Sequence, residues 1–150
     1  MSHVIASTDL SQLGVDVVVA SARLTRLASR DVSALPHAAM RLMGRLDELG
    51  PTRISELAKA DRCSQPTMSN LVQRQEENGW VRREPDPADS RASLISLTPA
   101  GRAELDRARH EAGEAIAARL KHLPQSDLET LQAAVTVMHR ILKPLEESNR

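Results

Sequence analysis

The polar residues of segment 64–74 have the types and the spacing needed to bind the base edges of DNA. On a helical wheel, Met68, Leu71 and Val72 fall on one side, while hydroxyl, amide and arginine side chains fall on the other. Amides and the arginine fork form paired hydrogen bonds with adenine and guanine in a major groove. The first acidic residue is Glu76, so the first two turns of such a helix hold no carboxylate. The candidate contacts are Ser64, Gln65, Pro66, Thr67, Ser69, Asn70, Gln73 and Arg74.

A second set of candidate contacts surrounds a polar loop with two prolines over residues 85–91. Asp89 stands two residues before Arg91, and we expect its carboxylate to hold the guanidinium by a charge-assisted hydrogen bond and to direct it outward. Narrow minor grooves attract an inserted arginine. Arg83 adds a cation just before this loop. Both features also have a plainer interpretation, because polar helix faces and mixed-charge turns occur on surfaces that bind nothing.

The elements that must position these side chains are mainly helices. Apolar residues alternately three and four positions apart predict a long helix at each end of the chain. Ser64 and Thr98 are typical N-cap residues, and each is followed closely by a proline that fits the first turn. Gly50 and Gly79 are typical of helix ends. The expected helices span about 9–30, 36–50, 54–60, 64–78, 99–122 and 124–145.

Two short strands are expected over 80–84 and 94–97, on either side of the polar loop. A two-stranded hairpin is not stable by itself and must lean on the helices. The expected fold is therefore mainly α with a small β-hairpin. It consists of a winged helix-turn-helix over 34–98 and long terminal helices over 1–33 and 99–150. Because the apolar stripes of the terminal helices are too long for the middle block to cover, we expect these helices to form a dimer.

Composition excludes several other classes of protein. The 150 residues suffice for about one domain, with 41% hydrophobic and 27% charged residues. Trp80 is the only aromatic residue, which excludes binders that stack single-stranded bases on rows of aromatic side chains. Lys and Arg number 20 and balance 20 Asp and Glu, so the chain is not a bulk polycation. A binder with few, placed cations remains possible.

Other motifs predict neither an enzyme nor a membrane protein. We find no phosphate-binding glycine loop, no Gly-x-Ser-x-Gly and no His-Glu-x-x-His, and no two histidines stand three or four residues apart. We therefore expect no catalysis, no cofactor and no metal. Neither a secretion signal nor a long apolar run occurs, which predicts a soluble cytoplasmic protein. The candidate DNA contacts described above would associate it with chromosomal DNA. Cys63 is either a small buried apolar residue or a thiol that oxidises.

Five segments, in this order, resemble the MarR family of bacterial transcription regulators. The most specific part is Asp89-Ser90-Arg91 followed by the Leu-Thr-x-x-Gly motif. Many members have a basic residue where this chain has Ser90, so a weaker contact of the hairpin is expected. The flanking helices also fit the family's layout. The matching segments are 54–58, 64–69, 79–83, 86–91 and 97–101.

This resemblance implies an obligate homodimer that binds an inverted-repeat operator in double-stranded DNA, commonly as a repressor released by a small ligand or an oxidant. By position, segment 64–74 resembles the family's recognition helix, and Asp89 with Arg91 resembles the tip of its wing. The resemblance also implies a crevice between the dimer helices and the DNA-binding lobe. Arg23, His37 and Arg41 are polar groups that could meet an anionic aromatic effector there.

A rival hypothesis is a dimeric winged-helix adaptor that binds proteins and has lost its DNA contacts. Such a module would be expected to carry acidic residues on the recognition helix and to lack the arginine of the wing. Gln65, Asn70, Arg74 and Arg91 favour the DNA-binding hypothesis instead.

Overall fold

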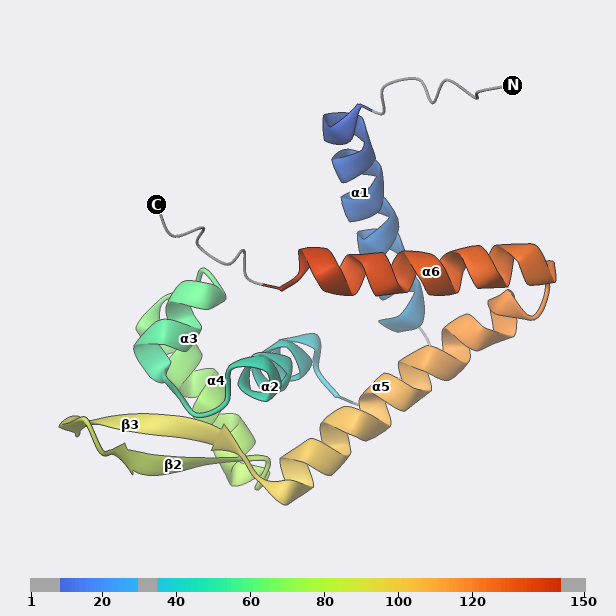
Figure 1. Cartoon of the computed structure of the whole chain (residues 1–150). Coiled ribbons are helices and arrows are strands. Elements are labelled where there is room, and N and C mark those ends of the chain that lie inside the picture. Colours follow the sequence, from blue (N-terminus) through green and yellow to red (C-terminus); the bar gives the residue numbers. More distant parts are fainter. Residues whose placement is uncertain (1–8, 30–34, 144–150) are drawn as a thin grey trace.

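The computed structural model describes residues 9–29 and 35–143 (Figure 1). Within these residues the chain forms six helices and one small antiparallel sheet, as the sequence predicts for a mainly α fold. The elements are α1 (Leu10–Ser29), α2 (His37–Leu49), β1 (Thr52–Arg53), α3 (Ile54–Ala60), α4 (Gln65–Glu77), β2 (Val81–Asp86), β3 (Asp89–Leu97), α5 (Pro99–Leu120) and α6 (Gln125–Ile141).

The predicted helix starts are confirmed by their caps. The Ser64 hydroxyl accepts a hydrogen bond from the Thr67 backbone N–H at 3.2 Å, and the Thr98 hydroxyl accepts one from the Gly101 N–H at 3.0 Å. Both caps satisfy backbone donors that a first helical turn leaves unpaired. Helix α2 begins one residue after the expected Pro36. The end of the apolar stripe of α6, at Leu145, lies outside the described residues.

The prediction of a polar loop over 85–91 was wrong, because both strands extend through it. Strands β2 and β3 pair antiparallel and leave only Pro87 and Ala88 at the turn. Pro85 is tolerated in β2 because this strand lies at the edge of the sheet, whose order is β1-β3-β2. The Asp86 carboxylate accepts a hydrogen bond from the Ala88 N–H at 2.8 Å, which closes the turn. This hairpin of β2 and β3 is called the wing below.

Strand β1 is a second departure from the expected two-stranded hairpin. Its two residues pair with the inner end of β3, Thr52 opposite Ile95 and Arg53 opposite Leu94. Two residues are too few to show an alternating pattern, so no signal in the sequence marked this strand. Its pairing ties the start of α3 to the wing, and the wing is thereby held on both sides of β3.

Two apolar clusters hold the described elements together, and α2 contributes to both. The first lies inside the lobe, between α2, α3, α4 and the sheet, and includes Leu46, Leu57, Met68 and Ile95. The second joins α2 to α5 and consists of Leu35, Ala39, Met43, Leu105 and Ala108. Asp47 of α2 reinforces the second contact with ion pairs to Arg102 and Arg109 of α5. Helix α2 is therefore the link between the lobe and the long helix α5.

The start of α5 is fixed against the turn that ends α4. The Thr98 hydroxyl donates a hydrogen bond to the Gly79 carbonyl at 2.6 Å, and the Thr98 N–H donates to the Trp80 carbonyl at 3.0 Å. Gly101 lies so close to Trp80 that a Cβ added to it would stand 1.9 Å from that carbonyl oxygen. The Leu-Thr-x-x-Gly motif is therefore a packing requirement of this junction.

Helices α1 and α6 expose large apolar side chains along much of their length. Leu10 and Leu24 of the α1 stripe are 78% and 49% exposed, and Val135 of the α6 stripe is 44% exposed. Helix α1 packs against α5 and projects away from the sheet (Figure 1). No described helix is long and apolar enough to cross a membrane. The stripes expected from the sequence are thus largely uncovered in the single chain.

The junction gives a direct test of this packing. Gly101→Ala should lower the free energy of unfolding by about 2–4 kcal/mol, because the added methyl meets backbone that cannot move aside. Gly113→Ala is the matched control, since nothing lies within 4 Å of the added Cβ at that position of the same helix. It should raise the stability by up to about 1 kcal/mol. Urea unfolding measures the free energy of unfolding of both variants. Equal values for Gly101→Ala and Gly113→Ala would show that the contact between Gly101 and Trp80 is not a packing requirement.

Candidate nucleic-acid interface

Helix α4 buries one face and exposes the other, as its sequence predicts. Met68, Val72 and Gln75 are buried in the lobe. The buried amide of Gln75 donates to the Leu71 carbonyl and accepts from the amide of Asn78. Ser69 is half-buried, and the other predicted contact residues of this segment are exposed. The outward face is therefore free to meet a partner along the first two turns.

The predicted contact residues of α4 differ in how far their polar atoms are already used. The hydroxyls of Ser64 and Thr67 bond to each other at 2.8 Å, and Ser64 also caps the helix. The Gln73 amide donates to Glu77 at 3.2 Å. The side chains of Gln65, Asn70 and Arg74 form no hydrogen bond or ion pair with any described residue. These three side chains keep their full hydrogen-bonding capacity for a partner.

The turn at the end of the wing is fixed by a buried carboxylate. Asp86 is 7% exposed and accepts hydrogen bonds from the Ala88 N–H at 2.8 Å and from Nε of Arg53 at 2.6 Å. These bonds, the backbone one foremost, hold the pKa of Asp86 below its usual range. The same ion pair raises the pKa of the Arg53 guanidinium. Sequence reasoning missed both roles, because it treated 85–91 as a loop and had no strand at Arg53.

The tip of the wing differs from the expectation in one contact. Asp89 accepts a hydrogen bond from the backbone N–H of Arg91 at 3.0 Å, whereas the expected bond to the guanidinium is not formed. The Arg91 side chain is exposed and has no ion pair among the described residues. Asp89 therefore shapes the backbone at the tip and leaves the Arg91 charge unneutralised. Arg83, in contrast, is tied to Glu76 of α4 at 3.0 Å.

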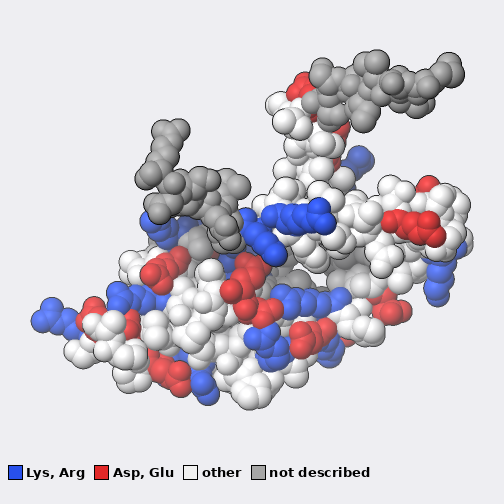
Figure 2. All heavy atoms as spheres, viewed as in Figure 1, with Lys and Arg blue, Asp and Glu red and all other residues white. Residues whose placement is uncertain are grey.

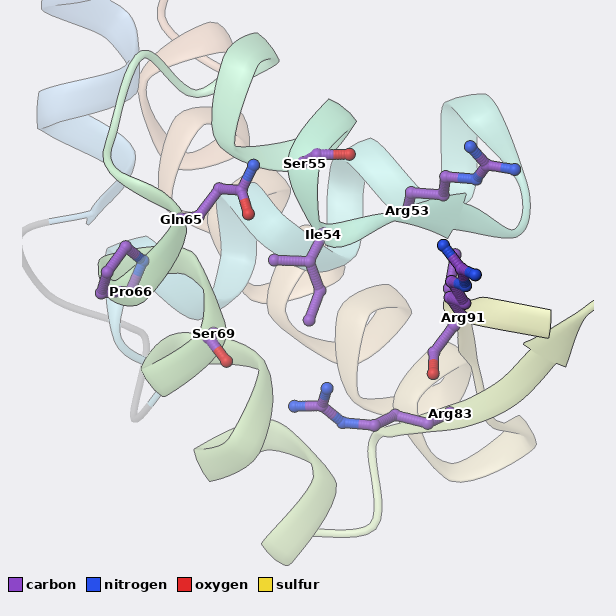
Figure 3. A pocket seen from close by; sticks show the side chains of 10 residues that line it. Arg53, Ile54, Ser55, Gln65, Pro66, Ser69, Arg83 and Arg91 are labelled. Carbon is purple, nitrogen blue, oxygen red and sulfur yellow. The ribbon is translucent and has the colours of Figure 1, made fainter. Parts of the chain in front are cut away.

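An open cavity of about 540 Å³ separates α4 from the wing (Figure 3). Arginines from three strands surround it: Arg53 from β1, Arg83 from β2 and Arg91 from β3. Gln65 and Ser69 of α4 form the opposite wall. Two of the three arginines are paired with carboxylates within the chain, so the cavity has one uncommitted cation. An anionic group of a partner would find this charge beside the polar face of α4.

The three residues predicted to bind an effector do not share one cavity. Arg41 of α2 pairs with Asp61 through two hydrogen bonds of 3.0 and 2.7 Å and lies 3.3 Å from Nδ1 of His37. It lines a cavity of about 390 Å³ beside α4, together with Cys63 and Arg74. Arg23 lines a different cavity on α1, with Arg26 and its apolar neighbours. The sequence could not anticipate Asp61 as the partner of Arg41, because 20 residues separate them.

The Arg41–Asp61 pair shifts both groups toward their charged forms. The guanidinium lowers the pKa of the Asp61 carboxyl, and the carboxylate raises the pKa of Arg41. Cys63 is half-buried and packs against the lobe's apolar cluster, as a small apolar residue does. Its oxidation stays a prediction. In the part of the chain that is described, no group of three or more metal-ligating side chains comes together.

Charges of both signs are interspersed over the surface, so no single-signed field dominates the face seen in Figure 2. This distribution agrees with the zero net charge of the chain. With no net charge over the whole chain, recognition of a partner must depend on individually placed groups more than on bulk attraction.

Comparison with known proteins matches residues 35–93 to the model of the MarR family. The HTH-type transcriptional repressor NicR of Pseudomonas putida is 38% identical over 61 residues, which are 41% of this chain and 39% of NicR. The matched stretch of NicR is thus well under half of that protein. The family match runs from the residues just before α2 into β3, and so includes α4 and the turn of the wing.

Solved structures extend the likeness over most of the chain. A probable transcriptional regulator from Pseudomonas aeruginosa is 30% identical, with a TM-score of 0.56, and the match covers 85% of this chain and 96% of that one. The F27L mutant of MepR from S. aureus, solved bound to an oligodeoxyribonucleotide, is 21% identical with a TM-score of 0.62. That match covers 87% of this chain and 98% of MepR, and it shows a shared fold.

The Asp86 anchor predicts how stability depends on pH. Because the folded-state pKa of Asp86 is lowered, its contribution is present above the unfolded-state pKa of about 3.9 and is lost as pH falls through the folded value. Asp86→Asn should therefore be less stable than the parent at pH 7 and should lose less stability between pH 6 and pH 3. Arg53→Met should fall in between, since it keeps the Ala88 bond. Urea unfolding measures the free energy of unfolding of the three proteins across this pH range. If this free energy changes with pH equally in the parent and in Asp86→Asn, Asp86 does not stabilise the fold in the way described.

Proposed function

The chain belongs to the MarR family of transcriptional regulators, and from that premise we propose that it binds an inverted-repeat operator in double-stranded DNA as a homodimer and represses transcription. Proteins of this family are non-enzymatic transcription factors. In this proposal the segment 34–98 is the DNA-binding lobe, and the segments 1–33 and 99–150 form the dimerisation region.

One observation carries the proposal: the exposed face of α4 offers uncommitted amides and an uncommitted arginine beside an unpaired arginine of the wing. The side chains of Gln65, Asn70 and Arg74 form no hydrogen bond or ion pair with any described residue, and neither does the side chain of Arg91 of the wing. The acidic residues of α4 lie at its far end, where Glu76 is engaged with Arg83. An adaptor that binds proteins would not require these amides and arginines to stay unpaired with carboxylates.

The geometry favours contact with two grooves. Helix α4 enters the major groove with its amino-terminal residues, where amides and arginine read base edges. The wing extends beside it, and Arg91 at its tip enters the narrower minor groove, which attracts arginine. Twofold symmetry then requires two half-sites whose centres lie about one helical turn, roughly 10 base pairs, apart.

The exposed apolar faces of α1 and α6 support the dimer. Large apolar side chains that are 37% to 78% exposed recur from Leu10 to Leu24 and from Leu131 to Leu142. Such a set is unusual for a soluble monomer, and contiguous patches of this kind mark interfaces. Packing these faces against a second copy would bury them in one shared helical core. Each lobe would then be held by its own α5, whose start is fixed on residues 79–80.

The proposal includes release of the operator by a small effector. A ligand relieves repression only if it binds one lobe spacing better than another. The cavity on α1 offers Arg23 to an anionic aromatic compound, and the cavity beside α4 offers Arg74 next to the Arg41–Asp61 pair. Titration of anionic phenolic compounds against the operator complex tests release by a ligand. A separate titration with peroxide tests release by oxidation of the Cys63 thiol. An operator affinity that none of them changes would leave a constitutive binder.

Selection of bound fragments from the protein's own genome tests the central proposal. It should enrich fragments that share one inverted repeat, and the enriched duplex should bind far more tightly than a shuffled duplex of the same composition. Recovery of no common sequence, together with no measurable binding of the recovered fragments, would favour the adaptor hypothesis.

The DNA contacts predict graded losses in operator affinity. Arg74→Ala and Arg91→Ala should each weaken binding by about 1–3 kcal/mol, or roughly 5–150-fold, because each removes an uncommitted arginine. Arg82→Ala is the matched control, since this exposed wing arginine is already paired with Glu84 and Ser96. Fluorescence anisotropy at about 150 mM salt measures the three variants. Parent-like affinity of both test variants would refute the assigned contacts.

The dimer predicts that charges on the apolar faces separate the chains. Leu13→Lys combined with Val135→Lys should give a folded monomer with little operator affinity, because both positions lie on the apolar stripes and are about half exposed in the single chain. Gln12→Lys, on an exposed polar position of α1, should stay dimeric. Analytical ultracentrifugation compares the masses. A double variant that remains a dimer with full affinity would show that these faces do not form the interface.

A further inference from the structure

The turn between α3 and α4 places an arginine where the backbone favours glycine. Arg62 has φ of 52° and is the only described residue other than glycine with a positive φ. The Arg62 N–H bonds to the Lys59 carbonyl at 3.3 Å, and the Cys63 N–H bonds back to the Ala58 carbonyl at 3.0 Å. This pair of bonds is the Schellman motif, whose left-handed position is usually filled by glycine. A residue with a Cβ is strained there.

Packing within the chain does not account for an arginine at this position. Its side chain is exposed and forms no hydrogen bond or ion pair with any described residue. The neighbouring carboxylate, Asp61, is already committed to Arg41 through both oxygens. Lys59, one turn earlier, is likewise exposed and unpaired among the described residues. The Arg62 guanidinium in this turn therefore has no carboxylate partner among the described residues of the lobe.

The position of Arg62 in the chain points to the partner of that charge. Ser64 caps α4 two residues later, and Gln65 begins the face proposed to read bases. Three residues span at most about 11 Å between Cα atoms, so Arg62 stands beside the end of α4 that enters the groove. Phosphates line the edges of that groove, and arginine binds them with two hydrogen bonds.

We propose that Arg62 binds a phosphate of the DNA backbone at the edge of the major groove and thereby sets how α4 is seated. This inference rests on the proposed function, and it adds a contact that carries no sequence information of its own. A structural alternative is that the cation interacts with the carboxyl end of α3, which favours positive charge. The two roles differ in what they do to stability and to salt dependence.

The test uses the full-length protein with Arg62→Gly, Arg62→Asn and Arg62→Lys. Glycine and asparagine tolerate the left-handed backbone without the charge, and lysine keeps the charge. Arg82→Asn controls for the change in net charge. Binding is measured by fluorescence anisotropy over a range of salt concentrations, on a duplex with the selected inverted repeat and on a shuffled duplex. Thermal unfolding of each variant is measured in parallel.

The glycine and asparagine variants should weaken binding to both duplexes equally, by about five- to tenfold, and lower the salt slope by about one unit per chain. Arg62→Lys and Arg82→Asn should stay close to the parent. Arg62→Gly should melt about 2–4 °C higher, because the strain is relieved. Unchanged binding with a lower melting temperature would overturn the proposal in favour of the helix-end role, and a loss confined to the operator would overturn it too. If the parent binds neither duplex, it is the proposed function that fails.

Discussion

The contact between the start of α5 and the turn at residues 79–80 is the constraint on which the rest of the structure depends. Thr98 caps α5 with the same hydroxyl that bonds the Gly79 carbonyl, and Gly101 lets the helix approach the Trp80 backbone. The turn at 79–80 also ends α4 and begins the wing. A single junction therefore sets the direction of the reading helix, the wing and the long helix relative to one another. The cluster between α2 and α5 then holds that arrangement.

The second organising feature is the division of arginines into committed and uncommitted groups. Arg41, Arg53 and Arg83 are each paired with a carboxylate and thereby join elements distant in sequence. Arg62, Arg74 and Arg91 have no such partner among the described residues. All three lie along α4, its preceding turn or the tip of the wing. A chain with zero net charge can therefore present a localised set of cations without becoming a polycation.

The sequence predicted what depends on local rules. Helix starts at Ser64 and Thr98 follow from capping chemistry, and the buried face of α4 follows from its period. It missed what depends on pairing across the chain: strand β1, which is too short for a pattern, and the partners Asp61 of Arg41 and Asp86 of Arg53. The loop prediction over 85–91 failed because prolines at an edge strand and at a tight turn look the same as prolines in a loop. The contact residues of α4 and the wing stay predictions, which the exposed and uncommitted side chains of Gln65, Asn70, Arg74 and Arg91 support.

The central claim is that two copies of the chain present two α4 helices to one face of DNA. Hydroxyl-radical and base-methylation footprints on the selected duplex test it most directly. The account predicts two symmetric patches of major-groove protection about one helical turn apart, each flanked on its outer side by minor-groove protection from a wing. A single unpaired patch, or uniform protection that does not depend on sequence, would contradict it.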